Sequence, residues 1–189
     1  MAKMYPIIIG RVGIDAALYH VQNALLGGLE WLDDAFGRTE RRERIFNGKK
    51  ERVQCVYKGE ENTPNDYLEL TPDEHIGNYS FFVLHDPARV RWRPNIQKRI
   101  TQPFSLIMWF NIAKIDGRNI ESVRLEVLKI IDRCRFSGGE IEISAIYETT
   151  KAVWKDIAEI SDLAMYHPFA GLRFDGQITY IEPCVKPLS

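Results

Sequence analysis

The fold class is decided by residues 104–133, which open with FSLIMWFNI and close with IESVRLEVLKIIDR. The opening segment, 104–112, is the most apolar in the chain, and its length and aromatic content favour a central β-strand. In the closing segment, 120–133, apolar residues recur at the spacing of an amphipathic helix, which Asn119 is placed to cap. A buried strand followed by such a helix predicts helices packed on a sheet.

The segments that follow continue the alternation of strand and helix. Residues 140–148 and 171–181 alternate apolar and polar side chains, as half-buried strands do. Between them, Thr149 or Thr150 caps a predicted helix that runs through Ile157 and Ile160. The second half of the chain is therefore predicted as strand, helix, strand, helix and strand.

The first half begins with a predicted helix that starts near Arg11 and stops at Gly27-Gly28, because two glycines favour a helix end. Apolar residues over 29–36 predict a second short helical piece. Further on, 79–84 is a predicted apolar strand. Residues 89–93 alternate charged and apolar side chains and predict a half-exposed strand.

A β-hairpin and a loop are predicted between these elements. Residues 41–58 form the hairpin, because Asn47-Gly48 favours the positive φ angles of a tight turn between two strands. Residues 59–77 contain two prolines and two glycines together with many acids, and predict a loop with little regular structure.

These elements predict a single α+β domain over residues 1–189. It has a mostly antiparallel sheet, two or three helices packed on one face, and a protruding β-hairpin. Residues 38–77, the hairpin arm and the acidic loop, are an insertion in this domain. The length of 189 residues, with 45% apolar residues, is enough to bury a core.

The net charge of −1 conceals opposed blocks along the chain. The sequence has 25 Lys and Arg against 26 Asp and Glu, which argues against a uniformly basic nucleic-acid binder and against an acidic tail. Residues 38–58, however, carry a net charge of +5, residues 59–75 carry −6, and residues 86–99 carry +4. Charge is therefore a clue to contacts even though its total is near zero.

The three cysteines, Cys55, Cys134 and Cys184, are scattered and do not form a CxxC pair. We expect reduced thiols in a protein made in the cytoplasm. The apolar run Ile7–Ile9 is too short for the core of a signal peptide, and no segment approaches the length of a membrane span. We therefore expect a soluble protein with no membrane partner.

Sequence motifs of known catalytic and cofactor sites are absent. The chain has no GxGxxG, GxxxxGK[ST], HExxH, GxSxG or EF-hand loop, and its four histidines are isolated in sequence. We therefore predict no catalytic residue, no metal site, no cofactor and no enzymatic activity. The alternative is an enzyme whose site is built from distant residues around His85 and Asp86, and it requires a concave pocket that joins them to other polar groups.

Several stretches, taken in order, carry a resemblance to a known family. They are the opening YPIIIGRVGIDAAL (5–18), the strands 78–83 and 104–112, the helix 120–133 and the closing strand 171–180. This order resembles the tail-completion or tail-terminator (head–tail joining) proteins of long-tailed bacteriophages and prophages.

The resemblance implies an α+β protein without a catalytic site that forms a ring at the head-proximal end of the tail. It implies a structural virion protein, made in the cytoplasm of the bacterial host and then part of the virion. The partners it implies are copies of the chain itself, in a ring for which a hexamer is one candidate, and other tail or head-completion proteins.

The opposed charge blocks suit a head-to-tail contact in such a ring, in which the basic hairpin of one copy meets the acidic loop of the next. The candidate interface residues are Arg41, Arg42, Arg44, Lys49, Lys50, Glu60, Glu61, Asp66, Asp73 and Glu74. The alternative is that the two blocks flank each other within one subunit, or lie in solvent.

A second candidate function is a nucleic-acid-binding accessory protein. The basic and aromatic residues of segment 89–99 resemble the mixture found in proteins that bind single-stranded nucleic acid. The candidate residues are Arg89, Arg91, Trp92, Arg93, Lys98 and Arg99. The simpler interpretation of this segment is an exposed, charged rim of a hairpin.

Overall fold

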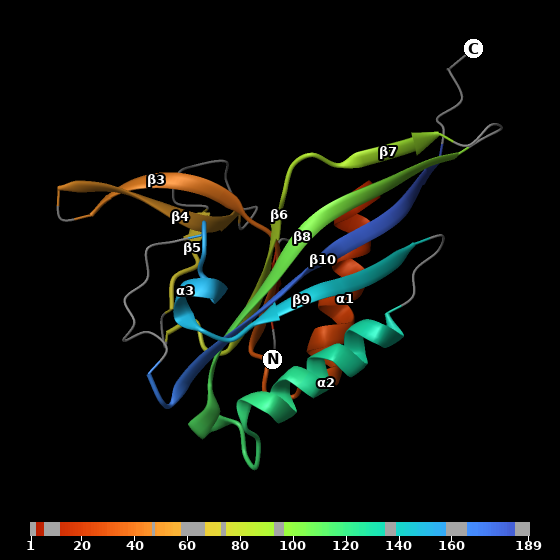
Figure 1. Ribbon diagram of the computed structural model, residues 1–189. Helices are drawn as coiled ribbons and strands as arrows, with labels where there is room; N and C mark the ends of the chain where they lie inside the picture. The colour runs from red at the N-terminus through yellow and green to blue at the C-terminus, as the bar shows by residue number, and fades with distance from the viewer. Residues whose placement is uncertain are drawn as a thin grey trace.

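The computed structural model describes residues 3–5, 12–46, 48–57, 67–72, 75–92, 97–134, 139–157 and 166–183. Its largest element is a seven-stranded sheet in the order β1-β2-β6-β8-β10-β9, with β7 paired to the same side of β8 as β6 (Figure 1). The strands are β1 (Lys3–Tyr5), β2 (Asp34–Arg38), β6 (Tyr79–Leu84), β7 (Arg89–Trp92), β8 (Gln97–Asn111), β9 (Glu140–Tyr147) and β10 (Phe169–Pro183).

Pairing in this sheet is mostly antiparallel, as predicted. Only β1 with β2 and β2 with β6 run parallel, and β8 and β10 pair along their whole length in one unbroken register. The predicted strand 104–112 is the inner part of β8. It lies between β6 and β10, which explains why its sequence is apolar on both faces.

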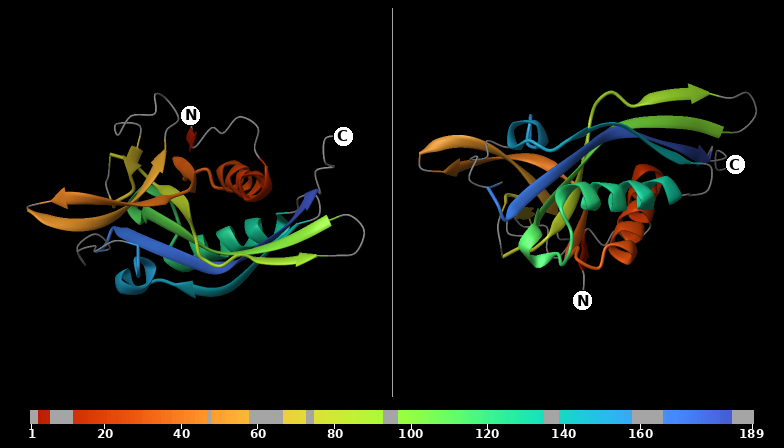
Figure 2. Two further views of the ribbon diagram at one scale, coloured as in Figure 1. Left: turned by 90° about the horizontal axis from the view of Figure 1, so that it is seen from above. Right: turned by 60° about the horizontal axis from the view of Figure 1, so that its bottom comes forward.

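Two helices, α1 (Gly13–Gly28) and α2 (Ile120–Arg133), pack on one face of the sheet, and the short α3 (Thr150–Val153) lies on the opposite face (Figure 2). The first core lies between α1, α2 and the sheet, and includes Val21, Val127 and Leu106. The second core lies on the other face and includes Ile107, Trp109 and Trp154. The α+β class and the helices on one face are therefore confirmed.

The predicted hairpin is the arm, formed by β3 (Glu40–Phe46) and β4 (Lys49–Tyr57), and β5 (Tyr67–Glu69) pairs with the base of β4. Gly48 in its turn has φ of 75°, as the Asn-Gly signal predicts. Val56 and Leu70, at the base of the arm, belong to the second core, whereas the turn end projects away from the main sheet (Figure 2).

Three local predictions differ from the structure. Residues 29–36 do not form a second helix, because 34–38 is strand β2, whose middle residues are buried between β1 and β6 and therefore show no alternation. Within 59–77, predicted as a loop, residues 67–69 are strand β5. The helix predicted to run through Ile157 ends at Val153, and Asp156 has φ of 61°, a left-handed conformation that a helix cannot continue through. Ile160 lies outside the described residues.

Among the described residues, no helix has both the length and the apolar character needed to cross a membrane.

Candidate functional site

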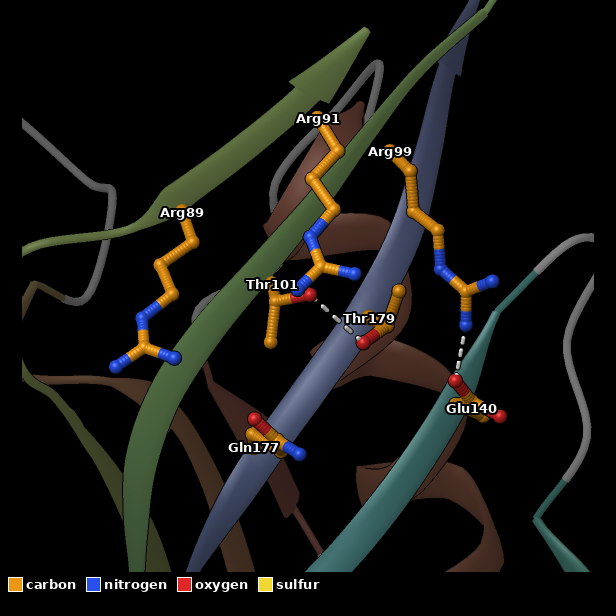
Figure 3. A pocket seen from close by; sticks show the side chains of 7 residues that line it. All are labelled: Arg89, Arg91, Arg99, Thr101, Glu140, Gln177 and Thr179. Atoms are coloured by element: carbon orange, nitrogen blue, oxygen red, sulfur yellow. Dashed lines mark hydrogen bonds and ion pairs between the residues drawn. The ribbon is translucent and has the colours of Figure 1, made fainter. Parts of the chain in front are cut away.

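Three arginines from two neighbouring strands gather on the face of the sheet opposite α1 and α2 (Figure 3). We call Arg89, Arg91 and Arg99 the arginine face. Arg89 pairs with Thr101 and Arg91 pairs directly with Arg99 in the register of β7 and β8. Residues that pair across an antiparallel ladder project to the same side, so the register alone places all three guanidinium groups on one surface.

The two central strands supply a polar floor beneath the arginines. Thr101 of β8 pairs with Thr179 of β10, and their hydroxyl oxygens lie 3.0 Å apart. Gln177 lies one step further along β10, and Glu140 of β9 pairs with Thr179 on its other side. These residues and the arginine face line a hollow of about 470 Å³ (Figure 3).

Positive charge dominates this hollow. The described residues of the lining supply three guanidinium groups and one carboxylate, that of Glu140, which forms an ion pair with Arg99. Arg89 and Arg91 are exposed and form no ion pair with any residue that the structure describes. The arrangement presents a fork of hydrogen-bond donors, together with hydroxyl and amide groups, to an incoming anion.

Only part of the predicted nucleic-acid segment contributes to this surface. Arg89, Arg91 and Arg99 come together, but Lys98 is the next residue to Arg99 in β8 and therefore projects to the opposite face. The side chain of Trp92, and the whole of Arg93, lie outside the described residues. Sequence reasoning missed Thr101, Gln177, Thr179 and Glu140, because only strand pairing brings them beside the arginines.

A second hollow, of about 360 Å³, lies at the bend between β6 and β7. His85 and Asp86 line it together with polar residues of the arm and of the turn after α3, including Arg41, Gln54 and Asp156. The enzyme alternative required a concave pocket of this kind, and the structure has one. Asp86, however, is exposed and forms no hydrogen bond to His85 among the described contacts.

A chain of hydrogen bonds leads from His85 into the sheet. His85 Nε2 lies 2.7 Å from Ser105 Oγ, which donates to Asp175 Oδ1 at 2.5 Å. Arg173 Nε donates to the same carboxylate oxygen at 2.6 Å. Because the single Ser105 proton goes to Asp175, the ring nitrogen Nε2 must carry the proton of the His85–Ser105 bond.

Burial lowers the pKa of His85 below its ordinary value of 6.5, and the nearby Arg173 guanidinium lowers it further. The neutral imidazole is a competent proton acceptor through its other nitrogen. Ser105 is fully buried, however, so its hydroxyl is not accessible to a substrate in the hollow. The hydrogen bonds from His85 to Asp175 therefore hold a histidine in place, but they give it no exposed nucleophile to activate.

The basic residues of the arm have several partners inside the same chain. Arg44 forms ion pairs with Glu51 at 3.1 Å and with Glu69 at 2.5 Å. The guanidinium carbon of Arg42 lies 3.4 Å from the centre of the Tyr67 ring, and Arg41 donates to the backbone oxygen of Asp156. Lys50 lies 3.6 Å from Glu43, and Lys49 is exposed.

The acidic side of the predicted interface lies outside the described residues. Those residues are Glu60, Glu61, Asp66, Asp73 and Glu74. The one acid of this block that the structure describes is Glu69, and its partner is Arg44 of the same chain. The contact between a basic and an acidic block therefore exists within one subunit at this pair, while the contact between subunits stays a prediction.

The described part of the chain holds no group of three or more His, Cys, Asp or Glu side chains arranged to bind a metal ion. Neither a protein-family model nor a curated protein matches the sequence. The two surfaces defined above, the arginine face and the arm, are therefore the basis for functional inference.

Proposed function

We propose that this chain is a structural, non-enzymatic component of a bacteriophage or prophage particle, a ring-forming tail-completion or neck protein that acts through protein–protein contacts. The observation that carries the proposal is the arm, whose turn end projects beyond the body of the protein (Figure 2). An element of this shape offers a long surface to a neighbour, because only the base of β4, residues 53–56, is buried in its own subunit.

The exposed end of the arm has a composition suited to a contact. Ile45 is 76% exposed near the turn, among charged neighbours. A large aliphatic side chain at the end of an otherwise charged hairpin gains free energy when a partner covers it, about 1.5–3 kcal/mol for full burial. Its exposure in the single chain is explained if a second chain covers it.

The charge of the arm favours a head-to-tail contact over a symmetric one. Residues 40–52 contain six bases and three acids, so two arms placed side by side across a two-fold axis would repel each other. A different, acidic surface is the better partner, and we propose the acidic segment 59–75 of the next copy. Contacts between two different surfaces of identical subunits close into rings when the rotation between copies allows it.

The proposal predicts a discrete multimer that depends on the arm, which native mass spectrometry and light scattering measure directly. Ile45→Asp is expected to convert the multimer to monomers without loss of folding, because the Ile45 side chain makes little contact within its own subunit. Val12→Asp is the matched control: Val12 is 77% exposed, and it is the N-cap residue of α1, where Asp is well tolerated.

A wild-type chain that stays monomeric at every concentration contradicts the proposal. An Ile45→Asp variant whose multimer has the same mass as that of the wild type also contradicts it. Negative-stain images of the multimer add a direct check, since closed rings are expected and open filaments or compact two-fold dimers are not.

A further inference from the structure

The positive charge of the arginine face is only partly balanced by the described residues of its own chain. Of its three guanidinium groups, only that of Arg99 has a carboxylate partner, Glu140, among the described residues. Arg89 and Arg91 project from an edge segment of the sheet over a hollow of about 470 Å³, and the described acid that lines this hollow, Glu140, is paired with Arg99 instead (Figure 3). The surface is therefore prepared for an external anion.

Arg91 and Arg99 lie directly opposite each other on β7 and β8, which places two positive charges side by side. Like charges placed opposite each other on a ladder destabilise the pair of strands. A bound anion between the two guanidinium groups would turn this repulsion into two attractions. Binding of an anion would therefore offset the repulsion between Arg91 and Arg99 that is present in the free protein.

The shape and lining of the hollow indicate which anion fits. The described residues that line it are arginine, threonine, glutamine and glutamate, and none of these has an aromatic or a purely aliphatic side chain. Sites for small organic ligands enclose most of the ligand and are lined largely by apolar groups. This surface instead offers polar groups, with guanidinium donors in the majority, across adjacent strands of a sheet, which suits phosphate groups presented along an extended polymer.

We infer that the arginine face binds the phosphodiester backbone of nucleic acid, without reading its sequence. Guanidinium groups contact phosphate oxygens with two parallel hydrogen bonds. In the Thr101–Thr179 pair one hydroxyl donates to the other, which leaves one hydroxyl proton to donate to a backbone oxygen. Among the described residues, no aromatic side chain lines the hollow to stack on a base. The affinity therefore comes from phosphate contacts and falls steeply with salt.

The arm of a second copy is a poor occupant of the same surface. The arm has six bases and three acids over 40–52, so it shares the sign of the arginine face. The arm and the β7–β8 end of the sheet also lie at opposite ends of the molecule (Figure 2). The inference is therefore independent of the proposed ring, and each can fail without the other.

Fluorescence anisotropy with labelled random-sequence DNA, double-stranded and single-stranded, tests the inference on the full chain. The association constant is expected to fall between about 50 and about 200 mM salt, with a log–log slope set by the number of phosphates contacted. Arg89→Gln and Arg91→Gln are each expected to weaken duplex binding about tenfold at low salt and to reduce the slope by about one unit. Both side chains are exposed, so both variants should keep the wild-type unfolding temperature.

Two matched controls remove one positive charge elsewhere. Lys98→Gln changes the residue next to Arg99, on the other face of β8, and Arg52→Gln changes the exposed surface of the arm. Both are expected to bind DNA within about twofold of the wild type, because neither lies at the arginine face. If the controls lost as much affinity for DNA as Arg91→Gln, the inference would be overturned, since binding would then depend on the net charge of the protein and not on the arginine face.

Competition separates phosphate polymers from other anions. Unlabelled DNA should displace the probe, whereas inorganic phosphate and poly-glutamate at the same charge concentration should do so only weakly. Displacement by poly-glutamate as strong as that by DNA would assign the surface to an acidic protein partner instead. Displacement by inorganic phosphate alone would assign it to a small anion, and both results contradict the inference.

Discussion

Arg44 of β3 and Glu69 of β5 form an ion pair inside one chain, with 2.5 Å between Nη1 and Oε2. Glu51 of β4 lies 3.1 Å from the other terminal nitrogen of the same guanidinium. A single basic residue of the arm thus ties together all three strands of the small sheet. It is not available for a neighbouring copy without the loss of these contacts, which makes Ile45 a sharper probe of assembly than the arm's arginines.

This pair yields a prediction about stability and salt. The Arg44 and Glu69 side chains are 29% and 43% exposed, so solvent screens much of their attraction. Glu69→Gln is expected to lower the free energy of unfolding by about 0.5 kcal/mol at low salt, and by less at high salt. Urea unfolding of both proteins at two salt concentrations measures the difference.

The pair of Lys50 and Glu43 provides the comparison on the same arm. Both side chains are well exposed and their charged atoms lie 3.6 Å apart, so Glu43→Gln is expected to leave stability unchanged. A larger loss in Glu43→Gln than in Glu69→Gln would show that the geometry around Arg44 contributes nothing particular.

Gly176 of β10 is the second residue with a testable constraint. The register between β10 and β9 shifts at Asp175 and Gly176, and a Cβ added at Gly176 would collide with the backbone carbonyl of Glu142. Because the obstacle is backbone on a paired strand, the strands must separate to relieve the clash. Gly176→Ala is expected to lower the free energy of unfolding by about 2 kcal/mol or more.

Gly27→Ala is the matched substitution. Nothing lies within 4 Å of a Cβ at Gly27, and the residue is helical, so alanine is expected to stabilise the protein by about 0.5–1 kcal/mol. Denaturant unfolding of the two variants in parallel distinguishes a steric effect at Gly176 from a general effect of replacing glycine. A stable Gly176→Ala protein would mean that β9 does not pair as described.

Local sequence patterns predicted some elements to the residue and missed others for a physical reason. Helix α2 begins and ends at the predicted Ile120 and Arg133, with Asn119 and Ser122 forming a reciprocal capping box. This helix could be predicted because its apolar periodicity and its N-cap are both set by residues close together in the sequence. Strand β2, in contrast, is buried between β1 and β6 and is too short to show a period, so the prediction of a helix for its apolar residues is wrong.

Local sequence patterns also could not predict which residues of distant strands line the two hollows. Alternation along 89–93 predicts that Arg89 and Arg91 share a face, and this holds. Their grouping with Thr179 depends on the register of β10, a strand about 80 residues later, which no local pattern encodes. The contact of Ser105 with Asp175 depends on the same pairing of β8 and β10, and the contact of His85 with Ser105 depends on the pairing of β6 and β8.

The half-buried ring of His85 leads to a prediction about how stability depends on pH. Burial is the main cause that lowers the pKa of His85, and Arg173 and Arg41 act in the same direction, against Asp175 and Asp156. In the unfolded chain the group has its ordinary pKa of about 6.5. Above this pH both states are neutral at His85, and its contribution to stability is complete.

Below about pH 6.5 the unfolded chain takes up a proton at this residue before the folded chain does, so stability falls as the pH falls. The fall continues until the pH passes the lower, folded pKa, beyond which both states are protonated. Urea unfolding between about pH 7.5 and about pH 5 is therefore expected to show a steeper loss of stability in the wild type than in His85→Gln.

An NMR titration of the His85 ring identifies the cause. The ring resonances should titrate below 6.5 in the folded protein, and they should still do so in Ser105→Ala, because burial and not the serine contact is the largest contribution to the shift. A His85 pKa at or above 6.5 in the folded wild type would contradict the partly buried placement of the ring. The same slope of stability against pH in wild type and His85→Gln would show that other groups carry the acid sensitivity of the fold.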